Sequence, residues 1–163
     1  MNAISAPWRM AYIQGEKPQG CVLCIPADDS ANVFVLHRGV RAFVMMNLYP
    51  YTAGHLMVVP NRHVALLEEL TPEERLEIFD LTTASVQVLK GALHPEGINI
   101  GINLGPAAGA GVEDHVHVHV VPRWCGDTNF MSVVGDVRVI PEDIARTWEK
   151  LLPYFRDALG EEK

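Results

Sequence analysis

Hydrophobic residues in the first half of the chain gather in short runs, each bounded by Gly, Pro or Asn. The runs at 33–36, 42–48 and 55–60 are rich in Val, Phe, Met and Leu. Short runs of this composition between turn-forming residues are typical of β-strands. Pro50 and Gly54 lie between the second and third runs and mark a turn. We therefore predict three strands in this part of the chain.

A different pattern begins at Thr71 and predicts a helix as far as about Leu93. Thr71 can cap the helix, Pro72 suits its first position, and Glu74 can bond back to the cap. This combination is a specific signature of a helix start. The buried face of the helix is expected to carry an apolar stripe of Leu76, Phe79, Val86 and Leu89.

The second half of the chain predicts two longer strands, at 98–104 and 115–122, separated by a Gly-rich loop at 105–111. A weaker strand is predicted at 137–140, and Pro141 is expected to open a last helix. The buried side of that helix is marked by Ile144, Trp148, Leu151, Leu152 and Phe155. The order of strands, helix, strands and helix favours an α+β domain, with helices packed on an antiparallel sheet.

Residues 1–20 show little periodicity and contain two Pro and two Gly, so we expect an N-terminal arm there. The rest of the chain, 21–160, is the size of a single domain. The composition of the whole chain, with 48% hydrophobic and 20% charged residues, is ordinary for a soluble globular protein.

The charge and the cysteine count exclude several classes of protein. A formal net charge of -7 argues against broad binding to nucleic-acid polymers or to a membrane surface, because both need a basic face. It does not exclude a nucleotide, since a small phosphate site needs only local donors. No secretory signal or long apolar stretch is apparent, and three cysteines do not form a disulfide framework. We therefore expect a cytoplasmic protein.

Three histidines alternate with valines near the middle of the second half: His115, His117 and His119. Side chains of a strand point alternately to its two faces, so the valines would enter the core and the imidazoles would share the other face. Residues four apart on a strand lie about 13 Å apart at Cα. His115 and His119 therefore cannot both touch one phosphorus atom. One of the three must perform the chemistry, with at most one neighbour assisting it.

A neutral imidazole nitrogen is a good nucleophile toward phosphorus and leaves easily from the phosphoramidate that it forms. Its second nitrogen must then be oriented by an acceptor, and a backbone carbonyl would serve. Just upstream lies a loop ending in Gly109, Ala110 and Gly111, whose backbone amides could surround anionic oxygens. The loop is not a P-loop, because no Gly-Lys-Ser/Thr follows it.

The pattern His-φ-His-φ-His-φ-φ at 115–121, where φ is apolar, resembles the signature of the histidine triad (HIT) family of nucleotidyl hydrolases and transferases. Segments 47–60, 103–105 and 121–130 resemble the branch of that family that acts on diadenosine tetraphosphate. That branch contains phosphorylases as well as hydrolases. The resemblance covers roughly residues 8–141.

The resemblance implies a HIT-like α+β fold, with an antiparallel sheet of about five strands and two main helices, and a homodimer. It implies that His117 is the nucleophile that becomes adenylylated on the α-phosphate, while His119 and His55 contact phosphate oxygens and the leaving group. Asn47 matches the position that hydrogen-bonds the ribose hydroxyls, and Asn103 matches an asparagine near the phosphates. The expected substrate is a nucleotide or a dinucleoside polyphosphate.

The chain departs from the family pattern in the loop before the histidines. Many members have Gln or Ser where this chain has Ala110 and Gly111. Help for the departing group must then come from backbone amides or from His119. The acceptor of the nucleotidyl group is phosphate or water, and the phosphorylase-containing branch favours phosphate slightly.

Cys21 and Cys24 have the spacing of half a zinc site. His63 and His115 could supply the missing ligands. His115 is available for this role because it lies too far from His119 for both to contact the same phosphate. Some histidine triad proteins resemble this arrangement, with a structural zinc held by two Cys and two His. The alternative is a pair of buried thiols beside a solvated His63. No organic cofactor is indicated.

Two other functions are compatible with the histidine pattern. In the first, two alternating histidines hold a catalytic zinc in a hydrolase, which requires a third ligand and an open position. In the second, the protein binds a nucleotide without turning it over. The first leaves the pattern around Asn47, His55 and Asn103 unexplained.

Overall fold

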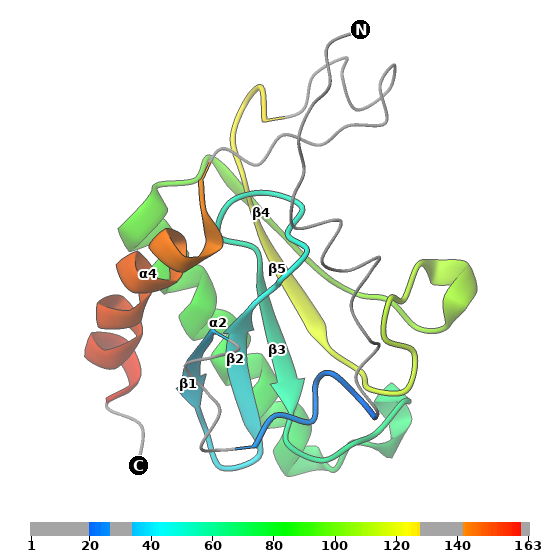
Figure 1. Cartoon of the computed structure of the whole chain (residues 1–163). Coiled ribbons are helices and arrows are strands. Elements are labelled where there is room, and N and C mark those ends of the chain that lie inside the picture. Colours follow the sequence, from blue (N-terminus) through cyan, green and yellow to red (C-terminus); the bar gives the residue numbers. More distant parts are fainter. Residues whose placement is uncertain (1–19, 27–33, 128–141, 161–163) are drawn as a thin grey trace, which may run out of the picture.

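The computed structural model describes residues 20–26, 34–127 and 142–160. Within them, five strands form one sheet: β1 (Val35–Arg38), β2 (Ala42–Met46), β3 (Leu56–Pro60), β4 (Gly97–Ile102) and β5 (Val118–Arg123). Two α-helices accompany it, α2 (Pro72–Leu93) and α4 (Ile144–Leu159), with short 3-10 turns η2 (Leu67–Glu69) and η3 (Pro106–Ala108). The expected α+β fold, with five strands and two main helices, is confirmed (Figure 1). The arm at 1–19, the strand at 137–140 and Pro141 lie outside the described residues.

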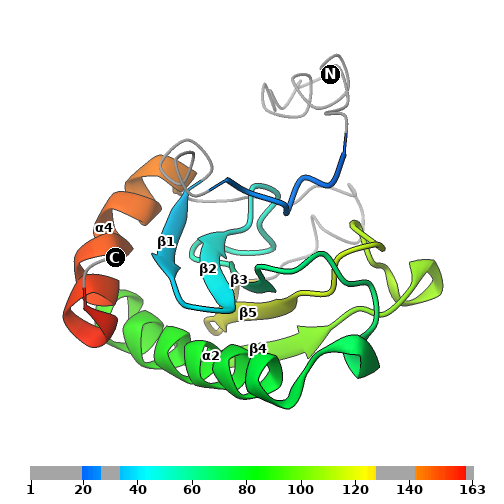
Figure 2. The same ribbon diagram turned by 90° about the horizontal axis from the view of Figure 1, so that it is seen from below.

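All neighbouring strands are antiparallel, in the order β1-β2-β3-β5-β4. Both α2 and α4 lie on one face of this sheet, and the segment 20–26 crosses the opposite side (Figure 2). Apolar residues therefore alternate along β2 between two clusters. Val44 and Met46 pack toward the helices, whereas Phe43 and Met45 pack with Leu23 on the other face. Burial on both faces explains why the central strands are continuous hydrophobic runs.

The start of α2 follows the sequence closely. The side chain of Thr71 accepts a hydrogen bond from the Glu74 amide, and the Glu74 carboxylate accepts one from the Thr71 amide, which completes the capping box. The helix runs to Leu93 as predicted, and His94 adopts a left-handed conformation as its C-cap. In α4, Asp143 provides the cap by accepting from the Ala145 amide at 2.8 Å.

The predicted apolar stripe of α2 is wrong in its first half. Leu76 and Phe79 are 63% and 71% exposed, whereas Leu89 is fully buried and Val86 packs against the core. The face on the sheet is built from a different set, namely Ile78, Leu81, Ser85, Val88, Leu89 and Ala92. Leu76 and Phe79 lie to one side of this face. The helix is apolar over more than one face, so periodicity alone did not select the buried one.

The strand predicted at 115–122 begins later, at Val118, so His115 and His117 precede the hydrogen-bonded ladder. The last residue of β3 that pairs with β5 is Val58, opposite Val118. Beyond it, Pro60 has no amide hydrogen to offer, and the Val116 amide donates instead to the carbonyl of Val64 at 2.7 Å. The histidine segment thus leaves the sheet and follows the loop after β3. Among the described residues, no helix has the length and hydrophobicity to cross a membrane.

Candidate active site and metal-binding cluster

The valines and histidines of the segment 115–120 separate as alternation predicts. Val116, Val118 and Val120 belong to the cluster beneath the helices. His119 lies in register with Met57, whose side chain belongs to the opposite cluster. The rings of His117 and His119 lie edge to face, at 4.8 Å between centroids. All three imidazoles are buried, with His115 at 0%, His117 at 6% and His119 at 9% exposure.

One nitrogen of His117 is assigned by its contact with the main chain. Its Nδ1 lies 2.8 Å from the carbonyl oxygen of His115. A carbonyl can only accept, so Nδ1 carries the ring proton and donates it. The lone pair of the neutral ring is then on Nε2. His117 therefore has the tautomer that a nucleophile needs, held by the backbone acceptor that the sequence led us to expect.

His55 and His119 form a relay of defined polarity. The Tyr51 amide donates to His55 Nδ1 at 3.0 Å, so the His55 proton is on Nε2. His55 Nε2 lies 2.9 Å from His119 Nδ1 and donates to it. His119 must then carry its proton on Nε2, which makes this atom a hydrogen-bond donor. The Tyr51 ring lies against both imidazoles, at 4.6 Å and 5.9 Å between centroids.

Burial favours the neutral form of two of the imidazoles, His115 and His119. Burial, and then the neighbouring His117, lower the pKa of His119 to about 4. Burial is also the main cause that lowers the pKa of His115, opposed by its hydrogen bond to Pro60. At neutral pH, His119 is therefore an uncharged donor.

Asn47 and Asn103 lie on opposite sides of the histidines. Asn47 follows β2, and its Nδ2 is 3.4 Å from both ring nitrogens of His55. Its Oδ1 accepts from the Tyr49 amide at 2.9 Å. Asn103 follows β4, and its Nδ2 contacts the carbonyl of Gly109 at 3.5 Å. The structure thus brings both predicted side chains to the ends of strands that flank the histidines.

The Gly-rich loop is a tight turn in its own right. Gly105 and Gly109 have φ values of 77° and 83°, which favour glycine. The Gly109 amide donates to the carbonyl of Pro106 at 3.0 Å, and the Ala110 amide to that of Gly105 at 3.3 Å. Two of the three amides expected to surround phosphate oxygens are therefore engaged within the turn. Gly111 follows them and is exposed.

Four further side chains converge at the other end of the histidine segment: Cys21, Cys24, His63 and His115. Their ligand atoms all lie within 4.8 Å of one another. The thiol of Cys21 is 3.4 Å from His115 Nδ1, and that of Cys24 is 3.4 Å from His63 Nδ1. The predicted set of metal ligands is thus brought together, and it could hold a metal ion.

The chemistry of this cluster suits a metal cation. His115 donates from Nε2 to the Pro60 carbonyl at 2.9 Å, which leaves the lone pair of Nδ1 on the side of the thiols. The Leu23 amide points to the Cys21 sulfur at 3.4 Å, a contact that stabilises a thiolate. Partial desolvation, and then the adjacent Cys21, raise the pKa of the Cys24 thiol, an effect that a bound cation would reverse. Two Cys and two His form a donor set that zinc prefers.

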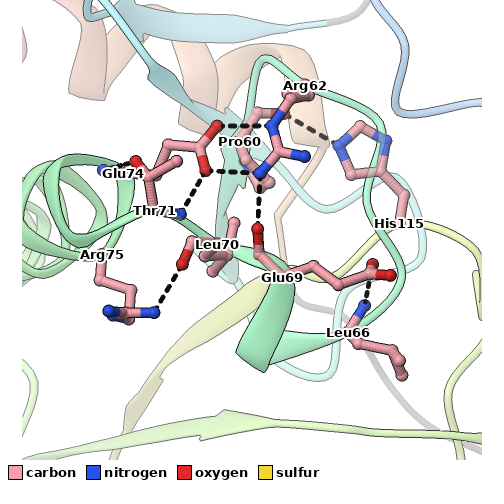
Figure 3. A network of polar contacts seen from close by, with 9 residues as sticks. All are labelled: Pro60, Arg62, Leu66, Glu69, Leu70, Thr71, Glu74, Arg75 and His115. Carbon is pink, nitrogen blue, oxygen red and sulfur yellow. Dashed lines mark hydrogen bonds and ion pairs between the residues drawn. The ribbon is translucent and has the colours of Figure 1, made fainter.

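The loop that carries His63 is fastened to the start of α2 by Arg62 (Figure 3). Arg62 donates from Nε and Nη2 to the two carboxylate oxygens of Glu74, at 3.0 Å and 2.8 Å. It also donates to the carbonyl of Glu69 at 2.7 Å. Because Glu74 belongs to the capping box of α2, these bonds tie Arg62, the residue next to His63 in sequence, to the start of the helix.

The sequence did not point to two residues that the structure places in these sites. Tyr51 supplies the amide that sets the tautomer of His55, and its ring covers His55 and His119. The sequence suggested only that it belonged to a turn. Arg62 positions the loop of His63. The only signal in the sequence was that Arg62 directly precedes His63, a predicted ligand.

His117 is a buried imidazole whose lone pair is on Nε2, and the imidazole of His119 beside it is a hydrogen-bond donor, an arrangement that could support nucleophilic catalysis by histidine. The HIT domain family model matches residues 28–125, so this chain belongs to the HIT family. It is 44% identical to the "AP-4-A phosphorylase" of Mycobacterium tuberculosis, over 93% of this chain and 83% of that protein.

Two other proteins extend the comparison. The chain is 38% identical to the "Bis(5'-nucleosyl)-tetraphosphatase [asymmetrical]" of Schizosaccharomyces pombe, over 57% of this chain and 50% of that protein. Its fold matches a zinc-bound histidine triad family protein from Mycobacterium smegmatis with a TM-score of 0.69 at 28% identity, covering 84% of this chain and 94% of that one. The resemblance drawn from the sequence is therefore confirmed.

Proposed function

We propose that the protein cleaves dinucleoside polyphosphates, such as diadenosine tetraphosphate, through a nucleotidyl-histidine intermediate on His117. The observation that carries this proposal is the bond from His117 Nδ1 to the His115 carbonyl, which leaves Nε2 as the nucleophilic atom. Relatives named as a phosphorylase and a tetraphosphatase of such compounds support the substrate class.

The reaction has two displacements at the same phosphorus. The Nε2 lone pair of His117 attacks the α-phosphorus, a P–N bond forms, and the bond to the polyphosphate breaks. With diadenosine tetraphosphate, ATP leaves and AMP is held on His117. An acceptor oxygen then attacks phosphorus, and the imidazole leaves with its electron pair. Throughout, the His115 carbonyl accepts from Nδ1–H and stabilises the positive charge on the modified ring.

The neighbouring residues bind and orient the substrate. His119 donates from Nε2 to a phosphate oxygen, and His55 keeps His119 in the tautomer that allows it. Asn47 binds the ribose hydroxyls, and Asn103 lies near the phosphates. In the loop of Gly109, Ala110 and Gly111, the first two amides are bonded within the turn, so the Gly111 amide is the one that completes the phosphate contacts. Since the loop lacks a Gln or Ser at its end, His119 and the backbone assist the leaving group.

Phosphate is the proposed acceptor, supported by the 44% identity to a phosphorylase. Product analysis with diadenosine tetraphosphate tests this choice. With inorganic phosphate, ADP plus ATP should form. AMP plus ATP, or two ADP, in the presence of phosphate would indicate hydrolysis instead.

The covalent intermediate provides a test of the mechanism itself. Brief mixing with substrate should add the mass of AMP to a peptide containing His117, and His117→Ala should abolish both the adduct and turnover. His94→Asn is a matched control, because His94 is an exposed C-cap in a left-handed conformation that Asn also accepts. Retained turnover in His117→Ala would refute the mechanism. Nucleotide binding without turnover by the unaltered protein would instead favour a pure binding function.

We further propose that Cys21, Cys24, His63 and His115 hold a structural zinc. Four protein ligands complete a tetrahedral shell, whereas catalytic zinc sites keep one position open, which disfavours a zinc hydrolase. Reduced thiols at this cluster support a cytoplasmic location. Metal analysis of protein purified without added zinc should give close to one zinc per chain, and much less would refute the site.

A homodimer is the proposed assembly. Strand β4 is an edge of the sheet, and Ile100 on it is 54% exposed. The two apolar residues of α2 that do not face the core, Leu76 and Phe79, are also exposed. Exposed apolar side chains near an unpaired strand edge are typical of an interface. Sedimentation of the purified protein tests this assembly.

A further inference from the structure

One row of side chains crosses the whole sheet on the face that carries the active site. The registers place Val35 opposite Met45, Met45 opposite Met57, Met57 opposite His119, and His119 opposite Gly101. The first three side chains are 2–7% exposed, and His119 is 9% exposed. At Gly101 the row is exposed and has no side chain. The flank of His119 toward β3 is therefore filled, and the flank toward β4 is open.

Neither packing nor backbone geometry requires glycine at 101. A Cβ built there would meet no heavy atom of the residues that the structure describes within 4 Å, and the residue does not have a positive φ. Glycine weakens a strand, and in that position it often marks the close approach of a ligand. Opposite Cβ atoms in an antiparallel pair are about 5 Å apart, so any side chain at 101 would stand beside the His119 ring.

The same face of β4 carries no apolar side chain, since it consists of Gly97, Asn99 and Gly101, whereas its other face carries Ile98, Ile100 and Ile102. Asn99 precedes Gly101 on the open face, and its Oδ1 accepts from Arg123 at 2.9 Å. Asn103 directly follows β4, whose last residue, Ile102, pairs with Val118, the residue after His117. Amide side chains thus flank the glycine beside both catalytic imidazoles.

We infer that the departing fragment of the substrate lies over this face of β4 and that Gly101 determines how large that fragment can be. The inference rests on the proposed function. Asn47 and His55 would hold the transferred nucleotide at the end of β2 and the start of β3, and Met57 and Met45 fill the rest of the β3 side of His119, so no room remains there for a second arm. The polyphosphate and its nucleoside then extend past His119 across Gly101, between Asn99 and Asn103.

Gly101→Val tests the inference with two substrates that transfer the same AMP. Diadenosine tetraphosphate expels ATP, whereas adenosine 5'-phosphorofluoridate expels only fluoride. We expect kcat/KM for the first to fall roughly 10- to 100-fold, because a side chain occupies the space of the departing fragment. Single-turnover fluoride release from the second should change by less than about threefold. Gly97→Val is the matched control, since Gly97 shares this face but lies four residues away, where a Cβ makes only ordinary contact at 3.9 Å.

If Gly101→Val slowed the reactions of both substrates by the same factor, or slowed neither, the inference would be overturned. Gly101→Ala adds a single methyl and should shift the ratio of the two rates in the same direction by a smaller factor, so it keeps the test valid if the valine variant does not fold. Equal sedimentation of variant and unaltered protein excludes an effect of altered assembly. Failure of the unaltered protein to cleave either substrate would refute the proposed function, which is a distinct result.

Discussion

Replacing Glu74 with Gln tests the network that joins the start of α2 to the loop of His63. The Glu74 carboxylate accepts hydrogen bonds from Nε and Nη2 of Arg62. It also accepts one from the Thr71 amide, at 2.8 Å. The Arg62 guanidinium, and then the Thr71 amide, lower the pKa of Glu74 to about 2. Gln keeps the shape of the side chain but loses the charge and one acceptor oxygen.

The shift sets an upper limit on the effect. Lowering the pKa of Glu74 from 4.5 to about 2 corresponds to about 3 kcal/mol in the free energy of unfolding at neutral pH. The Arg62 side chain is 49% exposed, so water screens the pair. We therefore expect Glu74→Gln to lower the free energy of unfolding by about 1–2 kcal/mol at pH 7. A carboxylate with a lowered pKa stabilises the fold above pH 4.5, and this stabilisation disappears as the pH falls toward 2.

Urea unfolding of zinc-loaded protein at several pH values measures this difference. Glu73→Gln is the matched control, because Glu73 lies in the same first turn of α2 but contributes nothing to the bonds with Arg62. The difference between unaltered protein and Glu74→Gln should be largest near pH 7 and shrink below pH 4.5. A midpoint lowered no further than that of Glu73→Gln would show that the network does not stabilise the fold.

Four further outcomes follow from the same geometry. His55→Ala should lower kcat for diadenosine tetraphosphate roughly 10- to 100-fold with intact folding, because His119 loses the donor that fixes its tautomer, and unchanged kcat would refute the relay. Cys24→Ser should lose most of the bound zinc and lower the melting temperature, as metal analysis and calorimetry can show, whereas the exposed Cys125→Ser should do neither. Burial lowers the pKa of His119 to about 4, so unfolding should become easier as the pH falls from 6.5 to 4, by up to about 3 kcal/mol, and His119→Asn should reduce this slope in urea titrations, leaving the smaller part that comes from His115. Phe79→Glu should convert a dimer to monomer in sedimentation without loss of helix content, since Phe79 is 71% exposed.

Local sequence signals predicted the elements of this fold well. The capping box at Thr71 and the turn residues around Pro50 each act over a few residues, so their outcome does not depend on the rest of the chain. The exposure of Leu76 and Phe79 was not predictable in this way, because the orientation of α2 is decided by the sheet and by α4. The late start of β5 depended on Pro60 and Val64, which are distant in sequence from His117.

The histidine segment shows the same division between local and distant information. The spacing of residues along a strand is enough to state that His115 and His119 cannot both contact one phosphorus atom. In the structure, their rings accordingly contact different partners. His115 turns to the thiols of Cys21 and Cys24, and His119 turns to His55. The tautomers follow from these partners and not from the segment itself.

The orientation of the His117 ring depends both on a residue close to it in sequence and on residues far from it. Its own ring makes a bond to the His115 carbonyl, and the His115 ring is held by Pro60 on one side and by the cysteines on the other. The backbone group that orients the nucleophile therefore belongs to a residue whose side chain is fixed outside the active site. Spacing alone could name the three histidines, but the direction in which Nε2 of His117 presents its lone pair required the folded contacts of residues more than fifty positions away.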